Sequence, residues 1–185
     1  HKEYRRQRQM CIRDRHPAMK SLRLLPVLSA ALLVCGPALA QSVDFTLPTF
    51  DQPFEIQKTW INLGFYSAHF DRDKGLENKN PGLGFEYPLN DVYRVTLGTF
   101  HNSDRRQSHY LGLYVLPFEF HGVRFGAVVG GFDGYPNYRN GNWFPALIPT
   151  AAIEGKNWGL NIAYVPTVKN RLYGALSFQL KYRFE

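Results

Sequence analysis

Two short stretches of the chain carry the residue types of acyl-transfer chemistry. His69 ends one apolar segment, and the run His-Asn-Ser at 101–103 ends another. An imidazole can take the proton of a hydroxyl group, and an amide can hold the oxyanion that develops on an attacked carbonyl. We therefore take three residues as the candidate catalytic set: His69 as general base, Ser103 as catalytic hydroxyl, and Asn102 as polar or oxyanion partner.

Metal and phosphate chemistry have no comparable support in the sequence. The four histidines after position 40 are His69, His101, His109 and His121, and they show no metal-ligand spacing. No phosphate-binding loop is present. We therefore expect neither a metal nor another cofactor.

The net charge of +7 belongs to one end of the chain. Residues 1–40 hold 8 of the 22 Lys and Arg residues and 2 of the 15 Asp and Glu residues, which leaves 14 basic and 13 acidic residues in 41–185. The remainder is close to neutral, so a domain built to neutralise nucleic-acid phosphates is excluded.

The basic N-terminal segment, residues 1–40, is expected to lie outside the fold and to include a leader. Residues 19–40 combine a positive start, a short apolar core and an Ala-Leu-Ala site, which is typical of a secretory signal peptide. Residues 1–18 precede a plausible start methionine and are set aside as non-native. Both cysteines, Cys11 and Cys35, fall before position 41, so an exported chain without disulfides is expected. Residues 41–56 form an N-terminal segment.

From residue 57 onward the chain alternates with a period of two. The clearest case is Leu172 to Phe184, where even positions are mostly apolar and odd positions mostly polar. The alternation and the turn signals between segments predict eight strands, over 57–70, 80–88, 91–102, 107–118, 122–133, 145–155, 157–166 and 171–184.

Eight alternating strands predict an all-β fold. Eight is the smallest even number that closes a transmembrane barrel, so residues 57–185 are expected to form an eight-stranded antiparallel up-and-down transmembrane β-barrel. Polar residues would then face the lumen, and aromatic residues near strand ends, such as Trp60, Trp143 and Trp158, would lie at the membrane interfaces. The alternative is a soluble barrel of lipocalin type with apolar residues inside.

The residues expected to face the lumen differ in type between the two halves of the barrel. One half collects polar and charged residues, among them Glu86, Arg94 and Lys181, that can form an ion-paired plug. The other half is small or aliphatic and leaves an outward-opening slot for an acyl chain. The expected slot residues are Gly64, Gly82, Gly84, Gly98, Gly112, Tyr114, Val128 and Ile148. Alternatively, the inward glycines only allow a small barrel to pack and twist.

Several motifs carry a family resemblance. Asn-Trp-Phe-Pro-Ala-Leu-Ile-Pro at 142–149, Ala-Tyr-Val-Pro-Thr at 163–167, Pro-Gly-Leu-Gly-Phe at 81–85 and Phe-His-Asn-Ser at 100–103 resemble motifs of the lipid A palmitoyltransferase (PagP) family of outer-membrane enzymes. The resemblance covers most of 57–184.

The resemblance implies a His–Asp–Ser group at the rim that moves palmitate from a phospholipid to lipid A. It also implies lateral lipid entry where prolines interrupt the strands, here Pro81, Pro149 and Pro166, since proline cannot donate to a ladder. The chain departs from the family in three places. Asn102 stands where the family has Asp, and Tyr114 stands where the family's slot has a small floor residue. The family's N-terminal amphipathic helix is missing, since the segment from Ser42 to Pro53 is interrupted by proline and too short.

Three functions follow as hypotheses. The first is an acyltransferase of the Gram-negative outer membrane, a monomer whose partners are membrane phospholipid and lipopolysaccharide, with no nucleic-acid partner. The second is a non-catalytic structural or lipid-binding barrel. The third is a lipid A deacylase, for which His101 and Ser103 have suitable spacing.

Overall fold

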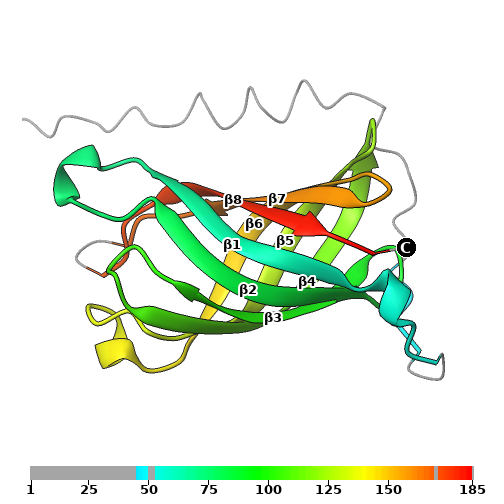
Figure 1. The fold of residues 1–185 in the computed structure, drawn as a ribbon, viewed down its shortest axis with the longest axis horizontal. Helices are drawn as coiled ribbons and strands as arrows, with labels where there is room; N and C mark the ends of the chain where they lie inside the picture. The colour runs from blue at the N-terminus through cyan, green and yellow to red at the C-terminus, as the bar shows by residue number, and fades with distance from the viewer. Residues whose placement is uncertain (1–44, 50–52, 169–170, 185) are drawn as a thin grey trace, which may run out of the picture. The chain divides into compact units, whose positions relative to one another are not determined.

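The chain folds into a single closed barrel (Figure 1). The computed structural model describes residues 45–49, 53–168 and 171–184. The expected signal peptide, residues 1–18 and both cysteines lie outside these described residues. All described residues belong to one compact unit.

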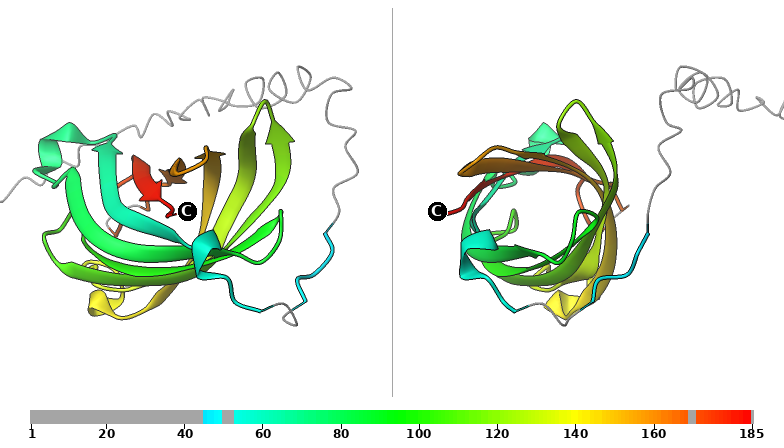
Figure 2. Two further views of the ribbon diagram at one scale, coloured as in Figure 1. Left: turned by 45° about the vertical axis from the view of Figure 1, so that its right-hand side comes forward. Right: turned by 90° about the vertical axis from the view of Figure 1, so that its right-hand side faces the viewer.

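Each strand pairs antiparallel with its neighbours in the sequence, and β8 pairs with β1 to close the barrel, which is seen end-on in Figure 2. The strands are β1 (Trp60–His69), β2 (Lys79–Pro88), β3 (Tyr93–His101), β4 (Gln107–Phe120), β5 (Val123–Phe132), β6 (Phe144–Glu154), β7 (Trp158–Val165) and β8 (Ala175–Tyr182). In the described ranges, three single turns of 3₁₀ helix flank the strands: η2 (Ile56–Lys58), η3 (Arg72–Lys74) and η4 (Arg139–Gly141). No helix among the described residues is long and apolar enough to cross a membrane.

The all-β class and the eight-stranded up-and-down topology are confirmed. The predicted strands match the observed ones closely, except that β8 begins at Ala175 and not at residue 171. The residues before it form a turn, in which Leu172 forms a bridge back to Val168.

Alternation sends apolar side chains outward and polar ones inward. Large apolar side chains on the outer surface are 44–66% exposed at Leu83, Leu97, Leu111, Leu147 and Leu180. On β8 the intervening residues Ser177, Gln179 and Lys181 are buried in the lumen. This orientation is the reverse of that expected for a lipocalin-type barrel.

A β-bulge at Gly64 changes which residues of β1 face the lumen, so the predicted faces of β1 are wrong beyond this residue. The register with β2 shifts between Asn62 and Gly64, and Gly64 has a φ of +83° that favours glycine. Beyond the bulge the alternation changes phase. Phe65 stands at an odd position like exposed Leu63, yet it packs inside against Phe100 with ring centroids 4.9 Å apart, while Tyr66 is exposed.

One half of the lumen is filled by an ion-paired plug. Lys181 Nζ lies 2.7 Å from Glu86 Oε1 and 2.6 Å from Glu154 Oε1, and Arg94 Nη2 lies 3.0 Å from Glu154 Oε2. The prediction that Trp60 sits at the membrane interface is wrong. Its side chain is only 1% exposed, because its ring faces the plug with Lys181 Nζ 5.0 Å from the ring centroid.

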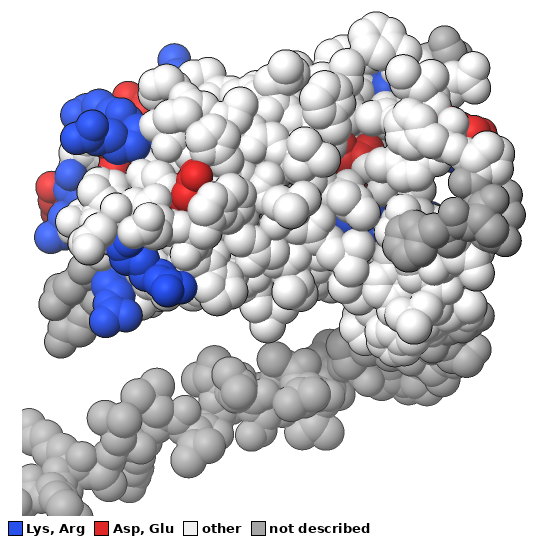
Figure 3. All heavy atoms as spheres, turned by 90° about the horizontal axis from the view of Figure 1, so that it is seen from below, with Lys and Arg blue, Asp and Glu red and all other residues white. Residues whose placement is uncertain are grey.

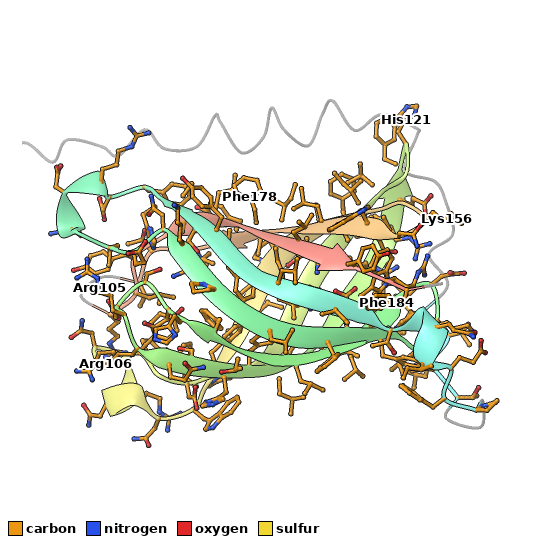
Figure 4. All side chains as sticks on the ribbon, viewed as in Figure 1. Arg105, Arg106, His121, Lys156, Phe178 and Phe184 are labelled. Carbon is orange, nitrogen blue, oxygen red and sulfur yellow. The ribbon has the colours of Figure 1, made fainter. Side chains whose placement is uncertain are left out.

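The two ends of the barrel differ. Long connections, including η3 and η4, lie at one end together with Arg105 and Arg106, whereas short turns carrying His121 and Lys156 lie at the other (Figure 4). On the face drawn in Figure 3, Lys and Arg side chains gather at the long-loop end, and the surface between the two ends shows few charges. We call the long-loop end the rim.

Candidate functional site

An apolar cavity of about 200 Å³ occupies the rim half of the lumen. Its walls come from all strands except β2. They are mainly aromatic, aliphatic and glycine residues: Phe65, Phe100, Tyr110, Gly112, Tyr114, Val128, Gly130, Phe132, Tyr135, Tyr138, Phe144, Ala146, Ile148, Ala163, Val165 and Pro166. Such a lining suits a hydrocarbon chain better than a polar ligand.

The eight expected slot residues separate into two groups. Gly112, Tyr114, Val128 and Ile148 line the cavity. The other four do not line it, and they are Gly64, Gly82, Gly84 and Gly98.

The side chain of Tyr110 explains why two of these glycines do not line the cavity. A Cβ placed on Gly84 would lie 2.0 Å from the Tyr110 hydroxyl, and one on Gly98 would lie 2.6 Å from it. These two glycines therefore make room for an aromatic ring that forms part of the cavity wall. The spacing of glycines in the sequence could not show which large residue fills the space over them.

The floor of the cavity rests on the plug. Tyr114 is 6% exposed, and its hydroxyl lies 3.3 Å from Asn161 Nδ2. The same Asn161 amide donates to Glu86 Oε2 at 2.8 Å. The Tyr114 ring is therefore the boundary between the apolar space above and the charged groups below.

A smaller polar pocket lies at the rim and adjoins the cavity. His69, Ser103 and Asp104 line this rim pocket. Tyr135 and Val165 line both spaces, so the two share a wall. An acyl chain in the cavity would therefore present its carbonyl end to the rim pocket.

Two loops bring His69 and Ser103 to this pocket. His69 is the last residue of β1, and the Glu77 backbone N–H, in the β1–β2 loop, donates to the Ser103 carbonyl at 3.0 Å. His69 Nδ1 lies 2.9 Å from Asn78 Oδ1, which fixes the ring. No hydrogen bond joins His69 to Ser103 within the described part of the chain, although both face the same space.

Asn102 has a different surrounding from the other two candidates. Its side chain is fully buried, and Nδ2 donates to Ser108 Oγ and to the Gly134 carbonyl, each at 2.8 Å. Its Oδ1 accepts from the backbone N–H groups of Asp104 at 2.9 Å and Arg106 at 3.0 Å. All four hydrogen-bonding positions are occupied, so this amide has no free donor for an oxyanion.

Asp104 is the residue that sequence reasoning missed. Burial raises the pKa of its carboxyl group, and the charge of nearby His69 opposes that rise. A carboxyl group therefore lines the same pocket as His69, two residues after Asn102 in the sequence. The position of Asp104 directly after Ser103 was the only sign in the sequence that it belongs to the site. That sign is weak, because charged residues are common in turns.

The barrel wall is incomplete beside the cavity. Pairing of β6 with β7 runs from Thr150 to Glu154 and stops there, so residues 144–149 of β6 have no partner on β7. Pro149 and Pro166 stand at this end of the ladder, where neither can donate a hydrogen bond, and Pro166 also lines the cavity. Pro81 is placed differently, since β1 and β2 continue to pair beyond it.

No group of His, Cys, Asp and Glu side chains that could hold a metal ion occurs in the described residues. His101, considered for deacylation, is exposed and does not line the rim pocket. No family model matches the chain, and no curated protein matches it.

Proposed function

We propose that this protein is an outer-membrane acyltransferase that moves a fatty acyl chain from a phospholipid to lipid A or a similar glycolipid. The observation that carries the proposal is the junction of two spaces. An apolar cavity of about 200 Å³ shares a wall with a polar pocket that holds His69, Ser103 and Asp104.

A membrane setting is supported by the outer surface of the barrel. Leucines on several strands point outward and stay about half exposed, while the charges lie in the plug and at the ends. An apolar band of this kind is stable against hydrocarbon and unfavourable against water. The unpaired stretch of β6 then offers a lipid tail a way into the cavity from the side.

The chemistry assigns one role to each rim residue. The Ser103 oxygen bonds to the carbonyl carbon of the donor ester while His69 accepts the serine proton, and His69 then returns that proton to the departing glycerol oxygen. In the second half, a hydroxyl of the acceptor attacks the acyl group on Ser103 and gives its proton to His69, which passes it back to the serine. Asp104 stabilises the protonated imidazole, and Asn102 holds the loop that carries Ser103.

Substitution of the rim residues tests the proposal. In a phospholipid-to-lipid A transfer assay, His69→Ala and Ser103→Ala are each expected to lower the rate roughly 100- to 10,000-fold. His109→Ala is the matched control, because His109 is another rim histidine but faces outward against Asp133. Normal transfer by the His69 and Ser103 variants would remove their roles.

A non-catalytic lipid-binding barrel is the second candidate, and one observation favours it. His69 is bonded to Asn78 and not to Ser103, so base and hydroxyl are not engaged in the described structure. This candidate predicts that lipids bind in the cavity while lipid A masses stay the same with and without the protein.

A further inference from the structure

The rim carries cations that form no ion pair with the described residues. Lys74, Arg105 and Arg171 come from three different loops, and none forms an ion pair with a described carboxylate. In the plug, by contrast, Arg94 and Lys181 are each paired with a carboxylate. The rim charges are therefore available to an anion from outside the chain.

Arg171 stands at the junction of the two spaces. It lines the rim pocket together with His69 and Ser103. Its guanidinium carbon lies 5.9 Å from the ring centroid of Tyr138, a residue of the cavity wall. A guanidinium held over an aromatic face keeps its N–H edges free for a bidentate acceptor.

Lys74 is held in a similar way. Its Nζ lies 5.9 Å from the ring centroid of Tyr173, which lines the rim pocket. Asp104 is a carboxyl group that lines this pocket, and it forms no ion pair with Lys74 or Arg171. Lys74 and Arg171 thus lie beside a pocket whose carboxyl group, Asp104, is not ion-paired with either of them.

We propose that Arg171, with Lys74 as a second positive charge, binds the phosphate of the donor glycerophospholipid. The inference rests on the proposed function, because it assumes that the acyl ester lies between His69 and Ser103. In a glycerophospholipid only the glycerol unit separates that ester from the phosphate, so the phosphate falls within or beside the same pocket. Guanidinium and phosphate match in shape as well as in charge, which gives two parallel hydrogen bonds.

Other rim cations fit this role less well. Arg105 and Arg106 lie at the same end of the barrel (Figure 4), but neither lines the rim pocket. Arg105 also donates from Nη2 to the Gly75 carbonyl at 3.4 Å. Arg106 is exposed and provides a matched control of equal charge.

Binding to single-chain probes tests the inference without requiring turnover. The whole barrel in nonionic detergent is titrated with a lysophosphatidylglycerol and with a monoacylglycerol of equal chain length, which lacks the phosphate. Arg171→Gln is expected to weaken binding of the phosphate probe roughly 3- to 10-fold and to leave the other probe unchanged. Lys74→Gln is expected to act in the same direction, and Arg106→Gln to change neither probe. Added salt should reduce the difference between the probes.

Three outcomes would overturn the inference. The first is equal affinity of the unsubstituted protein for both probes. The second is an equal loss of binding in the Arg171→Gln and Arg106→Gln variants. The third is an effect of Arg171→Gln on binding of lipid A alone, tested as a third probe, because the bound phosphate would then belong to the acceptor. These outcomes differ from failure of the proposed function, because selective phosphate binding can be seen in a protein that transfers no acyl chain.

Discussion

Replacement of Tyr114 by alanine should lengthen the acyl chain that the barrel accepts. A cavity of roughly 150 Å³ takes a six-carbon benzene ring, so the 200 Å³ observed here has room for roughly eight carbons. At about 0.8 kcal/mol per methylene, their burial contributes on the order of 6 kcal/mol gross. The Tyr114 ring is itself a six-carbon unit at the floor, and its removal extends the space by roughly four to six carbons.

The assay offers the protein phospholipids of graded chain length and measures the mass of the acylated product. The preferred chain should lengthen by roughly four to six carbons in Tyr114→Ala and stay the same in Tyr114→Phe, which keeps the ring. Loss of the buried ring should also lower the free energy of unfolding by about 3–5 kcal/mol. A folded Tyr114→Ala protein with an unchanged chain-length profile would refute the assignment of this ring as the floor.

Three further substitutions probe the plug, the wall and the rim. Lys181→Met removes the nearest counter-charge of buried Glu86 and leaves it only Arg94, whose Nε lies 3.9 Å from Glu86 Oε1, so the free energy of unfolding in micelles should fall by about 3 kcal/mol. Pro149→Ala adds a backbone donor beside the gap, and the transfer rate should fall roughly 2- to 10-fold if one more ladder hydrogen bond forms, with the chain-length profile unchanged. Because burial raises the pKa of Asp104, the folded state holds more protons than the unfolded state between pH 3.8 and the raised pKa of the folded state, and stability should fall as pH rises through this window. Unfolding measured over a pH series should lose that slope in Asp104→Asn.

The period of two was sufficient to predict the architecture. On β8, burial of Gln179 and Lys181 beside exposed Leu180 follows the predicted faces directly. The plug was also predictable, because charges facing the lumen of a narrow barrel must pair with each other. The bulge at Gly64 was not, since an alternating pattern gives no sign of the residue at which it changes phase.

The site was predictable in outline and not in its contacts. The strand order placed His69 and Ser103 at one rim, because they end the first and third strands, and the structure brings both to one pocket. The four hydrogen bonds of Asn102 depend on Ser108, on the carbonyl of Gly134 and on the shape of its own turn, none of which can be read from a short motif. Long-range packing decides such contacts.

Mass spectrometry of lipid A from an outer-membrane host that expresses the chain is the most direct test of the central claim. An acyltransferase with an acyl slot in its lumen predicts lipid A species heavier by one acyl chain, which disappear when His69 is replaced by alanine. Identical lipid A spectra with and without the protein, at matched levels of folded barrel in the membrane, would contradict the claim.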